Sequence, residues 1–172
     1  MSPPVSPLPL VIRPEHPGDG EAIERLHVRA FGPGRFARTA YRLREGAGPL
    51  PALCFTALVG TYLVGSVRIG PALAGDAPLL VLGPLTVDPS FSNRGIGGAL
   101  MTRALDAARE AGHGLVVLVG DLPYYRRFGF APVPPGRLVL PGPVDPARFL
   151  WCELSEGARA AVNGSVAAIR SR

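Results

Sequence analysis

The sequence contains no lysine and few aromatic residues, although it is basic. Its 18 positively charged residues are all arginine, outnumber 13 acidic residues and give a net charge of +5. A positive surface attracts polyanions, which include both nucleic acids and phosphate-bearing small molecules. Aromatic residues make up only 7% of the chain and do not interleave with the arginines, which argues against a nucleic-acid-binding module. We keep that module as the weakest of three hypotheses.

Long apolar runs and metal-ligand clusters are also missing. No apolar stretch reaches the roughly 20 residues of a membrane span, so we expect no membrane partner. Cys54 and Cys152 lie far apart in apolar segments, and we expect two buried thiols of a cytoplasmic protein rather than a disulfide. The three histidines show no metal-ligand spacing, so we expect no metal. Residues 1–7 have no basic n-region and are predicted to be a disordered lead-in.

The hydrophobic pattern predicts one domain over residues 8–155, followed by a tail at 156–172 that forms at most a short helix. A chain of 172 residues is long enough for one domain with a substantial core. The predicted strands are residues 8–13, 52–59, 62–69, 79–87, 115–119, 130–133 and 149–154. The predicted helices are residues 22–31, with Asp19 as a candidate N-cap, and residues 35–45, 95–111 and 123–128.

The order of these elements predicts a mixed β-sheet flanked by helices, in a single α/β or α+β domain. The dipeptide Gly60-Thr61 between two strands is typical of an antiparallel hairpin. The strand–helix–strand unit over residues 79–119 needs a crossover connection, which favours two parallel strands.

A glycine-rich turn, Arg94-Gly95-Ile96-Gly97-Gly98-Ala99, opens the long helix. The first N–H groups of a helix have no internal partner and carry the positive end of its dipole, so an anion binds there favourably. Glycine lets phosphate oxygens approach the backbone, and Arg94 adds charge-assisted hydrogen bonds. An isolated glycine cluster would more often serve only a tight turn and close packing, but here it follows a buried strand and opens an amphipathic helix.

Two familiar phosphate loops do not fit this turn. A Walker A loop ends in Gly-Lys-Ser/Thr, and the chain has no lysine. A dinucleotide fingerprint follows its strand directly and has glycine where this chain has Leu100. The stretch Ser92-Asn93-Arg94-Gly95-Ile96-Gly97 instead resembles motif A of the GNAT superfamily of N-acetyltransferases, [QR]-x-x-G-x-[GA]. Ser92 departs from the usual Gln or Arg and weakens one side-chain contact to the phosphates, while the backbone cradle remains.

This resemblance implies an acetyl-CoA-dependent acyltransferase with a sheet that is splayed at its centre. Pro84, in Leu82-Gly83-Pro84-Leu85-Thr86-Val87, cannot donate to a ladder and predicts a bulge or an opening in the sheet. In GNAT enzymes the pantetheine arm of CoA pairs with the equivalent strand, which makes Leu85, Thr86 and Val87 the expected backbone contacts. The phosphates would bind at Arg94, Gly95, Ile96, Gly97, Gly98 and Ala99.

A second motif, Tyr124-Tyr125-Arg126-Arg127-Phe128-Gly129-Phe130, resembles GNAT motif B. In the family, the tyrosine in the place of Tyr125 commonly reaches the CoA sulfur. A phenol stays protonated at neutral pH and can donate to a leaving thiolate, so Tyr125 is the expected general acid, whereas Tyr124 is expected to pack.

The leading hypothesis is acetyl transfer from acetyl-CoA to a primary amine of a small molecule or peptide, by direct attack in a ternary complex. No well-placed cysteine nucleophile is present. Glu21, Glu24 and Glu45, in the first two predicted helices, are weak candidates for a general base. The second hypothesis is a non-catalytic acyl-CoA-binding or sensing module on the same fold, and the resemblance also allows a homodimer.

Overall fold

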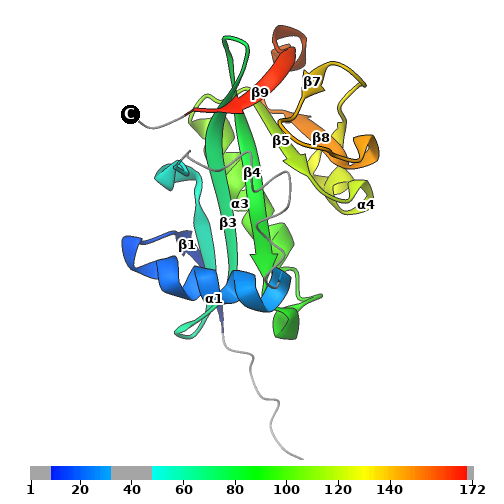
Figure 1. The fold of residues 1–172 in the computed structure, drawn as a ribbon. Coiled ribbons are helices and arrows are strands. Elements are labelled where there is room, and N and C mark those ends of the chain that lie inside the picture. Colours follow the sequence, from blue (N-terminus) through cyan, green and yellow to red (C-terminus); the bar gives the residue numbers. More distant parts are fainter. Residues whose placement is uncertain (1–8, 32–47, 170–172) are drawn as a thin grey trace, which may run out of the picture.

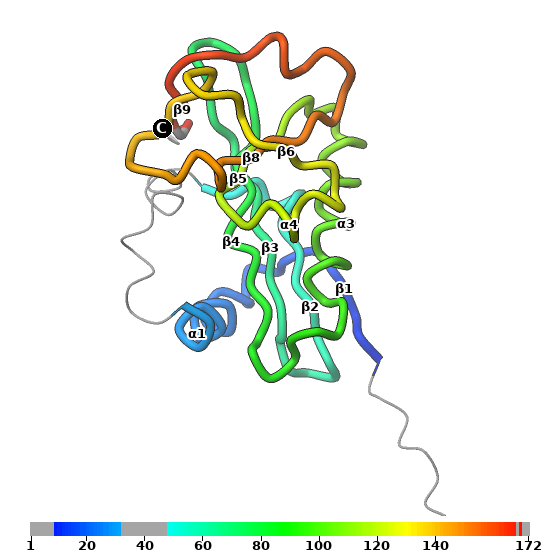
Figure 2. Tube along the Cα trace, turned by 90° about the vertical axis from the view of Figure 1, so that its right-hand side faces the viewer, coloured from blue at the N-terminus to red at the C-terminus, as the bar shows by residue number. Residues whose placement is uncertain are grey.

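The computed structural model describes residues 9–31 and 48–169 of the 172-residue chain. The predicted lead-in at 1–7 and the predicted helix at 35–45 lie outside the described residues. Within them, one mixed sheet separates helix α1 (Gly20–Phe31) from helix α3 (Ile96–Glu110), as Figure 2 shows. The predicted fold class is therefore confirmed.

The sheet runs in the order β1-β2-β3-β4-β5-β8-β6, with β9 beside the second half of β3 and β7 beside β9. Neighbouring strands are antiparallel except for the parallel pairs β4–β5 and β7–β9. As predicted, Gly60-Thr61 turns β2 into β3, and α3 forms the crossover between β4 and β5 (Figure 1). The strands are β1 (Leu10–Pro14), β2 (Phe55–Val59), β3 (Tyr62–Ala74), β4 (Ala77–Val87), β5 (Leu115–Val119), β6 (Ala131–Pro132), β7 (Leu138–Val139), β8 (Phe149–Glu153) and β9 (Gly164–Ala168).

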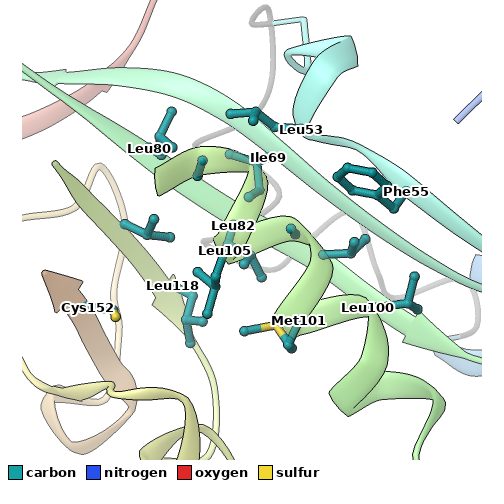
Figure 3. Close-up of a cluster of buried hydrophobic side chains, with 14 of the residues drawn as sticks. Leu53, Phe55, Ile69, Leu80, Leu82, Leu100, Met101, Leu105, Leu118 and Cys152 are labelled. Atoms are coloured by element: carbon teal, nitrogen blue, oxygen red, sulfur yellow. The ribbon is translucent and has the colours of Figure 1, made fainter. Parts of the chain in front are cut away.

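The apolar face of α3 fixes that helix against the sheet. Its buried residues recur every three or four positions and face β2, β3 and β4: Ile96, Leu100, Met101, Ala104, Leu105 and Ala108. They share a core with Phe55, Leu82 and Leu118 (Figure 3). Because burying such a side chain stabilises the fold by roughly 1.5–3 kcal/mol, this core holds the N-terminus of α3 in a defined place. On the opposite face, α1 buries Ile23 and Leu26 next to Leu63 of β3.

The strands around the first hairpins differ from the prediction at their ends. β3 and β4 continue as one long hairpin through Gly75-Asp76, although the sequence suggested that the strands end at 69 and resume at 79. Pro71 lies between the part of β3 that pairs with β2 and the part that pairs with β9. Proline is tolerated at such an interruption of a ladder, so the strand does not stop there.

The candidate N-cap role of Asp19 is wrong. The Asp19 carboxylate accepts hydrogen bonds from the Arg13 guanidinium at 2.7 and 3.0 Å and from the His16 backbone N–H at 2.7 Å. These bonds hold it in a 3-10 turn, Pro17–Asp19, that precedes α1.

The C-terminal part forms a strand rather than a helix. After the 3-10 turn Ala158–Ala161, β9 pairs with residues 72–74 of β3 and with β7. The strand predicted at 130–133 is reduced to the two residues of β6. The tail thus joins the edge of β3 that β2 leaves unpaired.

Candidate active site

β4 and β5 part from each other after a short contact, as Figure 1 shows. Parallel pairing is limited to Leu80 with Val116 and Val81 with Val117. Residues 82–87 of β4 keep β3 on one side and pair with no described strand on the other. Backbone N–H and C=O groups on that edge are therefore available to a ligand. The three predicted pantetheine contacts, residues 85–87, lie along this open edge.

A bulge in β4 lies where the two strands part. The register with β3 shifts so that Gly83 and Pro84 together face a single residue, Arg68. Gly83 has a φ of 136°, which a residue with a side chain rarely adopts. The bulge and the opening predicted at Pro84 are both observed.

The turn from β4 into α3 carries unpaired helix amides. Gly95, with a left-handed φ of 78°, precedes the first helical residue, and the Ala99 N–H donates to its carbonyl at 3.0 Å. The N–H groups of residues 96–98 therefore have no carbonyl partner inside the helix. Beside them, the Arg94 guanidinium lies 5.1 Å from the centroid of the Phe91 ring. A row of N–H dipoles next to an arginine suits a diphosphate.

Tyr124 brings helix α4 (Leu122–Tyr125) against the first turn of α3. Its hydroxyl lies so close to Gly97 that a methyl group on that residue would be 2.5 Å from the oxygen. The Phe128 ring approaches Gly98 less closely, at 3.8 Å from an added methyl group. Gly97, which was predicted as part of the phosphate cradle, is therefore also a point of close packing between α4 and α3. The sequence suggested packing for Tyr124 but not that its hydroxyl reaches α3.

Tyr125, the predicted general acid, lies just beyond the carboxyl end of β5. Its ring packs so closely on Gly120 that a side chain there would overlap it, and it also contacts the Tyr124 and Phe130 rings. Burial, with a smaller effect of Tyr124 and Asp121, raises the pKa of Tyr125 to about 12. The phenol is therefore protonated at neutral pH, and its hydroxyl makes no hydrogen bond within the described residues. The packing of the Tyr125 ring on Gly120 was not predicted from the sequence.

Asp88, directly after β4, anchors the turn to two other elements. Its buried carboxylate accepts hydrogen bonds from Arg29 of α1 at 3.0 Å, from the Tyr62 hydroxyl at 3.1 Å and from the Ser90 N–H at 2.9 Å. Burial alone would raise the pKa of Asp88, but these donors together lower it below its ordinary value. The Tyr62 ring lies 6.1 Å from that of Phe91, next to Arg94. Sequence analysis missed this network because no local pattern links residues so far apart.

The glutamates considered as general bases face solvent. Glu21 is 94% exposed at its side chain and lies 3.9 Å from Arg25, and Glu24 is 56% exposed and lies 3.9 Å from His27. Glu45 is outside the described residues. Across residues 9–31 and 48–169, no group of three His, Cys, Asp or Glu could hold a metal ion, and no helix is long and apolar enough to cross a membrane.

Both cysteines are buried and free, as predicted. Burial raises the pKa of Cys54 to about 11 and also raises that of Cys152. Since the thiolate is the nucleophilic form, a thiol with a raised pKa is poorly suited to covalent catalysis.

The structure thus brings the two predicted motifs to one place. Residues 94–99 form the turn into α3 and its first residues, and residues 85–87 form the open edge of β4 that leads to it. Helix α4, whose last residue is Tyr125, follows β5 on the other side of the opening (Figures 1 and 2). The contact between the Tyr124 hydroxyl and Gly97 holds α4 against the first turn of α3.

The sequence pattern of the acetyltransferase (GNAT) family matches residues 20–130. The chain is 32% identical to YjhQ of Escherichia coli K12 over 118 residues. This alignment covers 66% of this chain and 65% of YjhQ, so it spans slightly less than two thirds of that protein's length. It is also 32% identical over 123 residues to YhbS of the same organism, covering 70% of this chain and 73% of YhbS. Both relatives are named as uncharacterised N-acetyltransferases.

Solved structures share the fold over nearly the whole chain. Escherichia coli YhbS in complex with CoA matches with a TM-score of 0.80 at 28% identity, covering 98% of this chain and 93% of that one. A GNAT family acetyltransferase from Brucella melitensis in complex with acetyl-CoA matches with a TM-score of 0.61 at 28% identity, covering 88% and 98%. The likeness in fold therefore extends beyond the residues that match the family pattern.

Proposed function

We propose that this chain, which belongs to the acetyltransferase (GNAT) family, transfers an acetyl group from acetyl-CoA to a primary amine of a small molecule or peptide. The observation that carries the proposal is the open edge of β4, which leads to unpaired amides at the start of α3. Similar proteins were crystallised with CoA and with acetyl-CoA, which supports acetyl-CoA as the cosubstrate.

The cofactor would bind through the main chain more than through side chains. Its diphosphate would accept hydrogen bonds from the N–H groups over residues 94–99 and from the Arg94 guanidinium. Its pantetheine amides would pair with the open edge at Leu85, Thr86 and Val87. An amide of this edge could also donate to the thioester carbonyl, where negative charge develops during attack.

Transfer would proceed by direct attack in a ternary complex. The neutral amine adds to the thioester carbonyl carbon, the C–S bond breaks, and the acetyl group leaves with the amine as an amide. The sulfur departs as a thiolate and takes a proton from the Tyr125 phenol, which is then restored by the proton that the amine loses. The protonated state of Tyr125 and the buried, weakly acidic cysteines both support this route over an acyl-cysteine intermediate.

Tyr125→Phe tests the role of the phenol. We expect kcat to fall by about 10²-fold, as for loss of a general acid, while the Kd for acetyl-CoA stays unchanged. Release of free CoA with a panel of primary amines gives the rate, and calorimetry gives the affinity. A kcat equal to that of the wild type would remove the role assigned to Tyr125.

One observation favours a second candidate, a non-catalytic acyl-CoA-binding or sensing module. The Ser92 hydroxyl donates to the Pro89 carbonyl at 3.0 Å, so its only proton is not directed at a ligand. Glu21 and Glu24, the two candidate bases within the described residues, are also largely exposed to solvent. Tight binding of acetyl-CoA without release of CoA to any amine in the panel would favour the sensing module over the enzyme.

A further inference from the structure

The cradle at α3 lacks one side-chain donor that motif A usually supplies. Ser92 stands where the family has Gln or Arg, and its hydroxyl is bonded to Pro89 within its own turn. Arg94 is the sole cation of the stretch 92–99. A diphosphate carries two negative charges, so a second cation from elsewhere in the chain would complement it.

Arg127 lies next to the cradle, in the 3-10 turn Arg126–Phe128 that continues α4. Its guanidinium is 4.3 Å from the centroid of the Tyr124 ring and 5.3 Å from that of Phe128. Those two rings are the groups that contact Gly97 and Gly98 on the first turn of α3. The guanidinium and the first turn of α3 therefore contact the same two aromatic side chains.

The arginine is held in this position, although it is exposed. Its Nε donates to the Tyr124 carbonyl at 3.1 Å, and the ring stacking restricts the rest of the side chain. This hydrogen bond occupies Nε, and the guanidinium also interacts with the Tyr124 hydroxyl, which leaves at least three of its five N–H groups for a ligand. A positioned side chain loses less conformational entropy on binding than a mobile one.

No acidic residue neutralises Arg127 among the residues that the structure describes. The acid nearest in sequence, Asp121, lies 3.4 Å from Arg148 instead. Arg126, its neighbour, is also exposed but stacks on no ring and makes no side-chain hydrogen bond in the same part of the chain. The two adjacent arginines thus differ in position while carrying equal charge.

We infer that Arg127 is a second cation for the diphosphate of the cofactor, contributed by the turn after α4 in place of the side chain missing at Ser92. This inference rests on the proposed function, since it assumes that the α3 amides bind CoA. It adds that the diphosphate is held between two elements, α3 and the turn after α4, rather than by α3 alone.

The test compares Arg127→Gln with Arg126→Gln, each measured by calorimetry with CoA, dephospho-CoA and pantetheine. Both changes remove one positive charge, and glutamine keeps part of the side-chain length. We expect Arg127→Gln to weaken CoA and dephospho-CoA equally, by about ten- to a hundredfold, because both carry the diphosphate. Pantetheine lacks the diphosphate, so its affinity should not change. Arg126→Gln should bind all three ligands as the wild type does.

Each contrary result has a distinct meaning. Equal CoA affinities of the wild type and Arg127→Gln, or equal losses in the two variants, would overturn the inference and leave the proposed function intact. A loss for CoA but not for dephospho-CoA would place Arg127 at the 3′-phosphate and overturn the diphosphate assignment. No binding of CoA by the wild type would overturn the proposed function itself. Thermal melts of both variants show whether each remains folded.

Discussion

At the scale of single residues, the contact between Gly97 and the Tyr124 hydroxyl sets how closely α4 approaches α3. We expect Gly97→Ala to lower the melting temperature, because its methyl group would lie 2.5 Å from the hydroxyl oxygen. Gly98→Ala is the matched control: its methyl group meets Phe128 at an ordinary 3.8 Å, and alanine favours a helix over glycine by about 1 kcal/mol.

Removing the hydroxyl should reverse the effect. The double variant Gly97→Ala/Tyr124→Phe should melt above Gly97→Ala alone, since the clash is with the oxygen rather than with the ring. If Gly97→Ala were as stable as Gly98→Ala in thermal unfolding, the close approach would not constrain the fold.

The residues of the candidate site were predictable where a short motif carries them. The turn at residues 94–99 and Tyr125 each stand in a local pattern, and both lie at the opening of the sheet. Gly120 and Asp88 could not be assigned in this way, since their partners follow from how β5 and β4 pack against distant elements.

At the scale of elements, Asp88 joins the end of β4 to α1 and β3. We expect Asp88→Asn to lower the free energy of unfolding by about 2 kcal/mol at pH 7, because the buried carboxylate accepts three hydrogen bonds that a neutral amide would weaken or lose. Asp19→Asn is the control: its carboxylate is 12% exposed against 4% for Asp88, and its partner Arg13 lies only six residues away, so a smaller loss is expected. Urea unfolding followed by circular dichroism measures both.

The same carboxylate makes stability depend on pH in the acid range. The pKa of Asp88 is lower in the folded protein than its ordinary value of 3.8. Its stabilising effect is therefore complete above that value and is lost as the pH falls below it. Asp88→Asn should flatten the fall in stability below about pH 4, and an unchanged acid profile would contradict the hydrogen-bonded, ionised state.

Elements were predicted well where the local pattern and the tertiary partners agree. The apolar run Leu115–Val119, bounded by glycines, is the observed β5. β9 was missed because Gly164–Ala168 holds a single large apolar residue and pairs with an edge of β3 that no sequence pattern reveals. Asp19 failed as a cap because Arg13, six residues earlier, binds its carboxylate.

At the scale of the whole molecule, β9 ties the C-terminal part to a second core beneath the sheet. Val166 is 3% exposed and packs in the cluster that contains Leu115 and Trp151. We expect Val166→Ala to lower the free energy of unfolding by roughly 2 kcal/mol. The same change at Val139, which is 52% exposed on the neighbouring β7, should cost under about 0.5 kcal/mol. Equal effects in chemical denaturation would show that β9 is not part of the core.

The overall arrangement was predictable because a crossover helix between two apolar strands leaves little choice of topology. The length of the β3–β4 hairpin was not, since Gly70-Pro71 looks like a break until the partners on both edges of β3 are known.

β4 and β5 pair through only two pairs of residues, at Leu80–Val116 and Val81–Val117, and this short pairing has a consequence for how a bound cofactor would connect the sheet. Among the described strands, this pairing is the only backbone hydrogen bonding between strands β1 to β4 on one side and strands β5, β8 and β6 on the other. Acetyl-CoA bound in the opening, as we propose, would lie between residues 85–87 of β4 and the α4 side of the sheet, so the cofactor itself would connect the two sides where their backbone hydrogen bonds end.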